Sequence, residues 1–225
     1  KEHSIFLYAN YYGGAGVGIG DFDNDGLEDI FFAANLLDDK IYKNLGNLEF
    51  EDKTKMSGII NNGSWSTGVT VADVNNDGLL DIYVSCELYD DAPVLRRNKL
   101  YINQGSFKFK ESASEWGVDV DRRTRHSVFF DYNKDGLLDL YLLNHPPNTG
   151  NFSPFFGKDM SLPEYNLQLF ENKGNHFVDV TESAGLNRSG FPNAAVIGDF
   201  NKDGWPDIYV ANDFDSPDFL YFNNK

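Results

Sequence analysis

The chain has 225 residues and a formal net charge of −16, and 41% of its residues are hydrophobic, which is enough for a folded core. The acidic charge argues against nucleic acid as a partner, because phosphate binding needs a basic surface. Its single cysteine excludes an internal disulfide and a cysteine metal site, and no apolar run approaches the ~18 residues of a membrane helix.

An acidic nine-residue motif recurs four times along the chain. The copies read "DFDNDGLED", "DVNNDGLLD", "DYNKDGLLD" and "DFNKDGWPD", and each is followed by a short β-rich run. A second motif with an Asn-x-Gly turn follows, as in "LYINQGSFKF", and a third motif ("SGI", "WGV" or "AGL") closes the first three units. The order of the motifs predicts four units within one domain (residues 1–225), at about 13–60, 61–118, 119–186 and 187–225, the last incomplete.

Each acidic motif has the spacing of an oxygen-ligand loop. Positions 1, 3, 5 and 9 offer carboxylate or amide oxygens, position 7 offers a backbone carbonyl, and glycine at position 6 allows the sharp turn. This donor set suits Ca²⁺, about one ion per loop, because Mg²⁺ keeps more water and Zn²⁺ prefers His or Cys. The predicted metal ligands are Asp21, Asp23, Asp25, Leu27 and Asp29; Asp73, Asn75, Asp77, Leu79 and Asp81; Asp131, Asn133, Asp135, Leu137 and Asp139; and Asp199, Asn201, Asp203, Trp205 and Asp207.

An EF-hand is the alternative calcium loop, and position 12 argues against it. EF-hands need a bidentate Glu there and a helix after the loop. The four copies of the motif instead have Phe32, Val84, Leu142 and Val210 at position 12. Pro206 also disfavours a helix in the fourth copy. We therefore expect a strand, a calcium loop and a second strand in each unit.

The fold class expected from these units is all-β. Each unit has sequence for four antiparallel strands, the last two joined by the Asn-x-Gly turn, which is typical of a β-propeller blade. The glycines of "GGAGVGIG" (residues 13–20) are expected to let an inner strand approach the propeller axis closely. About four blades are present, either as part of a larger propeller or as a closed four-bladed ring completed by residues 4–9.

These motifs resemble the FG-GAP / VCBS repeat family, the calcium-loop blades of integrin α-subunit heads and of many bacterial surface proteins. The elements "GDFNKDGWPDIYVAND" and "LYxNxG" are most similar to the branch of cartilage-acidic-protein-like and ASPIC/UnbV-related proteins. The resemblance covers nearly all of the chain after Tyr12. It implies a propeller of about seven blades, with calcium bound by positions 1, 3, 5, 7 and 9 of each loop.

The resemblance and the missing catalytic constellation predict a non-catalytic module on the outer surface of a bacterial cell, secreted or part of an outer-membrane surface complex. The alternative is a calcium-dependent carbohydrate-active enzyme, similar to propeller-type polysaccharide lyases. A protein or glycan partner is expected on the face opposite the calcium loops, where connection length varies and basic residues gather. The candidate contacts are Arg122, Arg123, Arg125, His126, Phe152, Phe155 and Phe156. Salt bridges to Asp119 and Asp121, and burial of the three Phe residues, are the competing interpretation.

The four loops differ in charge. The first has aspartate at positions 1, 3, 5 and 9, whereas the others carry Asn75, Asn133 or Asn201 at position 3. Ligand charge raises calcium affinity. Counting aspartates therefore ranks the first loop as the tightest site.

Overall fold

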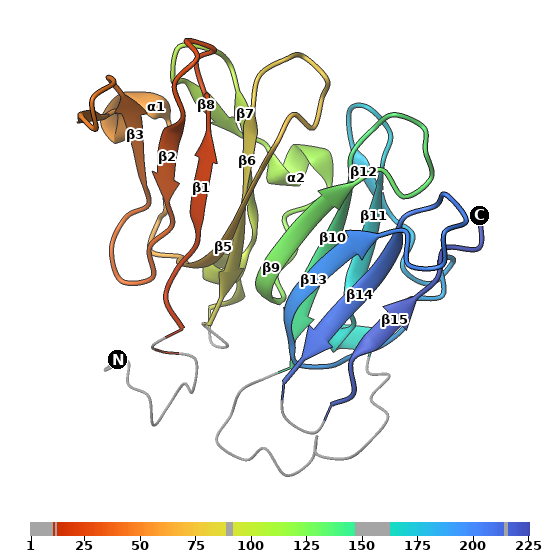
Figure 1. The fold of residues 1–225 in the computed structure, drawn as a ribbon. Helices are drawn as coiled ribbons and strands as arrows, with labels where there is room; N and C mark the ends of the chain where they lie inside the picture. Colours follow the sequence, from red (N-terminus) through yellow and green to blue (C-terminus); the bar gives the residue numbers. More distant parts are fainter. Residues whose placement is uncertain (1–10, 12, 89–91, 147–162, 214–215) are drawn as a thin grey trace.

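The computed structural model describes residue 11 and residues 13–88, 92–146, 163–213 and 216–225. These residues form four antiparallel sheets in which strands that are consecutive in sequence are hydrogen-bonded neighbours (Figure 1). The first sheet contains β1 (Val17–Gly20), β2 (Asp29–Phe32), β3 (Lys40–Asn44) and β4 (Phe50–Asp52), and the second contains β5 (Trp65–Ala72), β6 (Asp81–Glu87), β7 (Lys99–Asn103) and β8 (Phe109–Glu111). The third contains β9 (Arg123–Phe130), β10 (Asp139–His145), β11 (Gln168–Asn172) and β12 (Phe177–Asp179), and the fourth contains β13 (Pro192–Gly198), β14 (Asp207–Asn212) and β15 (Phe219–Tyr221). The predicted all-β fold of propeller-like blades is confirmed.

Each acidic loop joins the first two strands of its sheet. Gly20 pairs with Asp29 across the first loop, and Ala72 pairs with Asp81 across the second. The third and fourth loops are closed by the same kind of pair. A strand therefore follows every loop, as predicted, and the helix that an EF-hand requires does not form there.

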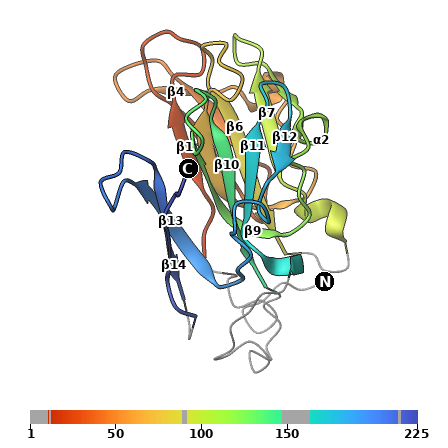
Figure 2. The same ribbon diagram turned by 90° about the vertical axis from the view of Figure 1, so that its right-hand side faces the viewer.

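The sheets pack face to face in chain order, which runs from left to right in Figure 1 and therefore from back to front in Figure 2. The core between the first and second sheets contains Phe31 and Ile41 from one side and Ile82 and Val84 from the other. Two further cores of the same kind lie between the second and third sheets and between the third and fourth. Strands β6 and β10 are buried along their whole length, which explains why they are apolar on both faces.

Glycine allows the innermost strands to approach one another closely. A Cβ atom on Gly18 of β1 would lie 2.7 Å from Cγ1 of Val69 and 2.8 Å from Cγ2 of Val71 in β5. A Cβ on Gly68 would lie 2.7 Å from the carbonyl oxygen of Arg125 in β9. These separations are too short for a real Cβ, so the glycines are required by packing, as the sequence predicts for residues 13–20.

The structure also contains short helices that the sequence analysis did not predict. One-turn helices α1 (Thr54–Ser57) and α2 (Ala113–Trp116) follow the outer strands of the first two sheets, and 3₁₀ turns η2 (Pro93–Arg96) and η3 (Pro163–Tyr165) lie in connections. Gly58 and Gly117 end α1 and α2 with φ of 80° and 75°. The "SGI" and "WGV" motifs are thus helix ends. No helix among the described residues is long and apolar enough to cross a membrane.

The four sheets form an open arc. Ile19 on β1 is 61% exposed, and Val196 on β13 is 56% exposed, on the outward faces of the first and last sheets. A closed four-bladed ring would bury both side chains against each other's sheets. The segment proposed to close such a ring, residues 4–9, lies outside the described residues.

Candidate metal centres

The four loops share one pattern of hydrogen bonds, and they lie at the same end of their sheets, the upper side of Figure 1. In the first loop, Oδ1 of Asp21 accepts from the backbone N–H of Asp25 (3.0 Å), and Oδ2 accepts from that of Gly26 (2.7 Å). The carboxylate at position 5 accepts a hydrogen bond from the backbone N–H of position 7, and Oδ1 of Asp25 lies 2.9 Å from the nitrogen of Leu27. The other three loops repeat these bonds at 2.8–3.1 Å. The loop shape is therefore set by the carboxylates at positions 1 and 5.

The position-9 aspartate anchors each loop to the third strand of its sheet. Asp29, Asp81, Asp139 and Asp207 are all at most 1% exposed. In each, Oδ2 accepts from the N–H of loop position 2 at 2.8–3.0 Å. Oδ1 accepts at 2.8–2.9 Å from the N–H of an asparagine, which begins the Asn-x-Gly turn in the first three sheets and is Asn223 in the fourth. A carboxylate oxygen has a second lone pair, so these bonds leave position 9 able to bind a metal.

Burial makes the ionised form of Asp29, Asp81 and Asp139 unfavourable without a cation. Loss of water raises the pKa of Asp81 to about 7 and that of Asp139 to about 6, despite the two backbone hydrogen bonds. Neighbouring loop carboxylates, Asp77 and Asp73 beside Asp81, raise the pKa further. Burial likewise raises the pKa of Asp29. A divalent ion would offset this charge.

The first loop provides a test of whether a cation fits. Asp21, Asp23 and Asp29 each bring one carboxylate oxygen to within 4.8 Å of the others. The ammonium group of Lys43 takes the place of a cation there: it donates to Oδ2 of Asp23 and, at 2.6 Å, to Oδ2 of Asp25. Oδ1 of Asp23 is buried and has no hydrogen-bond partner among the described residues. Hard oxygen donors, a cation between them and one spare buried oxygen together fit Ca²⁺.

Loops of neighbouring sheets are also hydrogen-bonded to each other, which sequence reasoning missed. The side chain at position 4 donates a hydrogen bond to the next loop: Nδ2 of Asn24 lies 3.0 Å from the carbonyl oxygen of Gly78. The asparagine whose N–H binds the position-9 aspartate donates a side-chain hydrogen bond to the preceding loop: Nδ2 of Asn103 lies 2.9 Å from the carbonyl oxygen of Phe22. Both contacts recur between later pairs of loops. The recurrence of this asparagine in the second motif of every unit was the sequence signal for the second contact.

The basic residues predicted to contact a partner do not form one exposed cluster. Strand β9 begins at Arg123, so residues 123–126 lie within the innermost strand and not in a connection. The side chain of Arg123 is buried, and Nη1 of Arg125 lies 3.1 Å from Oε2 of buried Glu87. His126 is half-buried, and burial lowers its pKa. Phe152, Phe155 and Phe156 lie outside the described residues.

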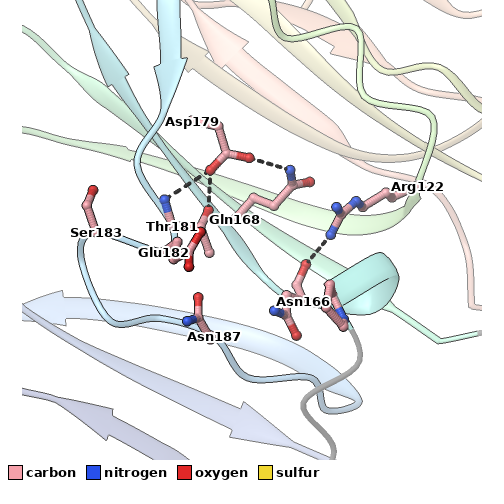
Figure 3. Close-up of a pocket in the computed structure, with 9 residues that line it drawn as sticks. Arg122, Asn166, Gln168, Asp179, Thr181, Glu182, Ser183 and Asn187 are labelled. Atoms are coloured by element: carbon pink, nitrogen blue, oxygen red, sulfur yellow. Dashed lines mark hydrogen bonds between the residues drawn. The ribbon is translucent and has the colours of Figure 1, made fainter.

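Arg122 lines a pocket of about 630 Å³ at the end of the third sheet opposite its acidic loop (Figure 3). Its guanidinium donates to the carbonyl oxygen of Asn166 at 3.0 Å. On the other wall, Asp179 accepts from the side chains of Gln168 (2.9 Å) and Thr181 (2.6 Å). The lining is rich in amide, hydroxyl and carboxylate groups: Asn166, Gln168, Asp179, Thr181, Glu182, Ser183 and Asn187.

Comparisons with known proteins identify the repeat. The family model described as "FG-GAP-like repeat" matches residues 21–84 and 160–210, which contain the first, second and fourth loops. Among solved structures, the crystal structure of the V. cholerae biofilm matrix protein Bap1 is similar, with 15% sequence identity and a TM-score of 0.39. The alignment covers 91% of this chain and 26% of that one, so the chain spans about a quarter of its length. No curated protein matches the chain. Because the family model matches just over half of the residues, the chain belongs to the FG-GAP-like repeat family.

Proposed function

We propose that this chain is a calcium-binding repeat module in which each of the four loops holds one Ca²⁺. The observation that supports this most is the first loop, where an ammonium group lies between two loop carboxylates and a buried oxygen of Asp23 has no hydrogen-bond partner in the described part of the chain. The ligands would be the residues at positions 1, 3, 5, 7 and 9. Bound calcium would neutralise the carboxylates and link the two ends of each loop.

Calcium in this module is structural. The loops connect consecutive strands and are joined to their neighbours by side-chain hydrogen bonds, so a bound ion would hold strands and sheets together. With three or four charged ligands per loop, we expect affinities near the ~10⁻⁴–10⁻³ M of extracellular modules. Such sites are filled where calcium is abundant, which supports a place outside the cell or on its surface.

Calcium binding can be tested by isothermal titration of the whole chain. We expect binding to about four sites, and we expect Asp77→Asn in the second loop to weaken or remove one of them, because position 5 loses its charge. Asp38→Asn is the matched control, since Asp38 is exposed and lies outside the loops. The proposal fails if millimolar calcium produces no saturable binding, or if both substitutions have the same effect.

We further propose that the end opposite the calcium loops binds a protein or glycan partner. The support is the pocket at Arg122, whose amide, hydroxyl and carboxylate lining could exchange hydrogen bonds with a hydroxyl-rich ligand. On a glycan array probed in calcium, we expect selective binding that Arg122→Ala reduces and that chelator weakens. Cleavage of a bound glycan would instead favour a carbohydrate-active enzyme, and binding unaffected by Arg122→Ala would place the partner elsewhere.

A further inference from the structure

One position beside the loops differs sharply among the four sheets. It is the residue just before the asparagine whose N–H binds the position-9 aspartate, and it lies on the third strand of the first three sheets and directly after the third strand of the fourth. Lys43 occupies it in the first sheet, Ile102 in the second, Glu171 in the third and Phe222 in the fourth. A cation, two apolar side chains and an anion therefore stand beside loops that are otherwise nearly alike.

Lys43 contacts the loop through its charged group. Its ammonium donates to Asp23 and Asp25, the residues at positions 3 and 5, and the side chain is 20% exposed. The same nitrogen lies 5.5 Å from the centre of the ring of Phe107, in the turn between β7 and β8, which limits how freely the side chain moves. The ammonium thus uses oxygens that a calcium ion would need.

Glu171, at the same position in the third sheet, carries a negative charge where Lys43 carries a positive one. Its Oε1 accepts from Nδ2 of Asn133, the position-3 residue of the third loop, at 3.0 Å. Oδ1 of Asn133 meanwhile accepts from the N–H of Asp135 within the loop, at 3.0 Å. Nδ2 of Asn133 also donates to Oδ2 of Asp135, at 3.0 Å, so Glu171 adds a bond to an amide that the loop already orients, as it does for Asn75 and Asn201. Its own charge is partly balanced by Lys173, whose Nζ lies 2.6 Å away.

We infer that Lys43 is a tethered cation that competes with calcium, so that the first loop is the weakest of the four sites and fills last. This inference rests on the proposed function. Calcium must displace the ammonium before it reaches Asp23 and Asp25, whereas no ammonium stands at the corresponding position of the other loops. Lys43 also removes one unit of negative charge from the site. Its effect outweighs the additional aspartate that distinguishes the first loop.

Lys43→Met tests the inference, because methionine keeps an unbranched stem and removes the charge. Lys40→Met is the matched control: Lys40 lies on the same strand but pairs with Asp52, 3.1 Å away, on the far side from the loop. Lys43→Arg keeps a positive charge and should behave like the wild type. The position-6 amides of Gly26, Gly78, Gly136 and Gly204 report each loop separately in ¹⁵N–¹H spectra during a calcium titration.

In the wild type we expect the Gly26 signal to respond at the highest calcium concentration of the four. Lys43→Met should lower the Gly26 midpoint roughly two- to fivefold, the size expected from removing a partly exposed ion pair, and leave the other midpoints in place. An unchanged Gly26 midpoint, or an equal change in Lys40→Met, overturns the inference while calcium binding stands. If none of the four glycine amides responds in any of these proteins, the proposed function itself is wrong.

Discussion

Removing calcium should lower the melting temperature of the chain by more than about 10 °C. Each filled site contributes about 2.7 kcal/mol when calcium exceeds its Kd a hundredfold, and 1 kcal/mol corresponds to about 2–4 °C for a chain of this size. The physical cause is the concentration of carboxylates: burial raises the pKa of Asp81 to about 7, which shows how unfavourable its charge is without a cation. Thermal melts in excess calcium and in EDTA measure the difference.

Two controls make this result specific. Magnesium at the same concentration should stabilise much less, because it requires a smaller octahedral site and gives up water reluctantly. A chain with position-5 substitutions in all four loops (Asp25→Asn, Asp77→Asn, Asp135→Asn and Asp203→Asn) should lose most of the calcium effect. Identical melts in calcium and EDTA would show that the loops hold their shape without a metal.

Replacing a position-9 aspartate should destabilise the protein more than replacing any other loop ligand. Asp139 is 0% exposed, and its two oxygens accept from the N–H groups of Tyr132 and Asn172. Asp139→Ala leaves both donors without partners, at about 1–3 kcal/mol for each buried group, and also removes a calcium ligand. Urea unfolding in calcium should show a loss of at least about 2–6 kcal/mol, the sum for the two unpaired donors.

Asp135→Ala is the comparison for this experiment, because Asp135 is an exposed ligand of the same loop. Both variants should lose one calcium site, but Asp139→Ala should remain less stable than the wild type in EDTA. Asp135→Ala should approach the wild type there, since calcium binding is most of what it loses. Equal stability of the two variants in EDTA would mean that the bonds made by Asp139 contribute nothing.

The fold and the loops were predictable because each repeat specifies them locally. Asp at positions 1 and 5, glycine at position 6 and Asp at position 9 satisfy one another within nine residues, and the strands on either side have a strong β pattern. The close approach of the inner strands could be predicted as well, since only glycine allows the distance between Gly18 and Val69. Four copies of the same signal identify the architecture more reliably than any one copy.

What could not be predicted depends on contacts between separate motifs. Lys43 lies 18 residues beyond Asp25, and only pairing of β2 with β3 brings its ammonium to the loop. The hydrogen bond from Asn103 to Phe22 spans 81 residues. The start of β9 at Arg123 was missed because its first residues are charged. Charge alone predicts exposure, but Glu87 provides Arg125 with a partner inside the protein.

The open arc has a consequence for how the molecule unfolds. Each sheet contacts the sheets before and after it in the chain, so stability is close to a sum of terms for single sheets and for neighbouring pairs, as in a one-dimensional chain of coupled units. Among the described residues, the two middle sheets have a neighbour on both faces, whereas the first and fourth sheets each have a neighbour on one. The fourth sheet has three described strands and exposes Val196 and Leu220 on its outward face. It should therefore exchange its amide hydrogens first, and loss of structure should proceed from the ends of the arc towards β6 and β10.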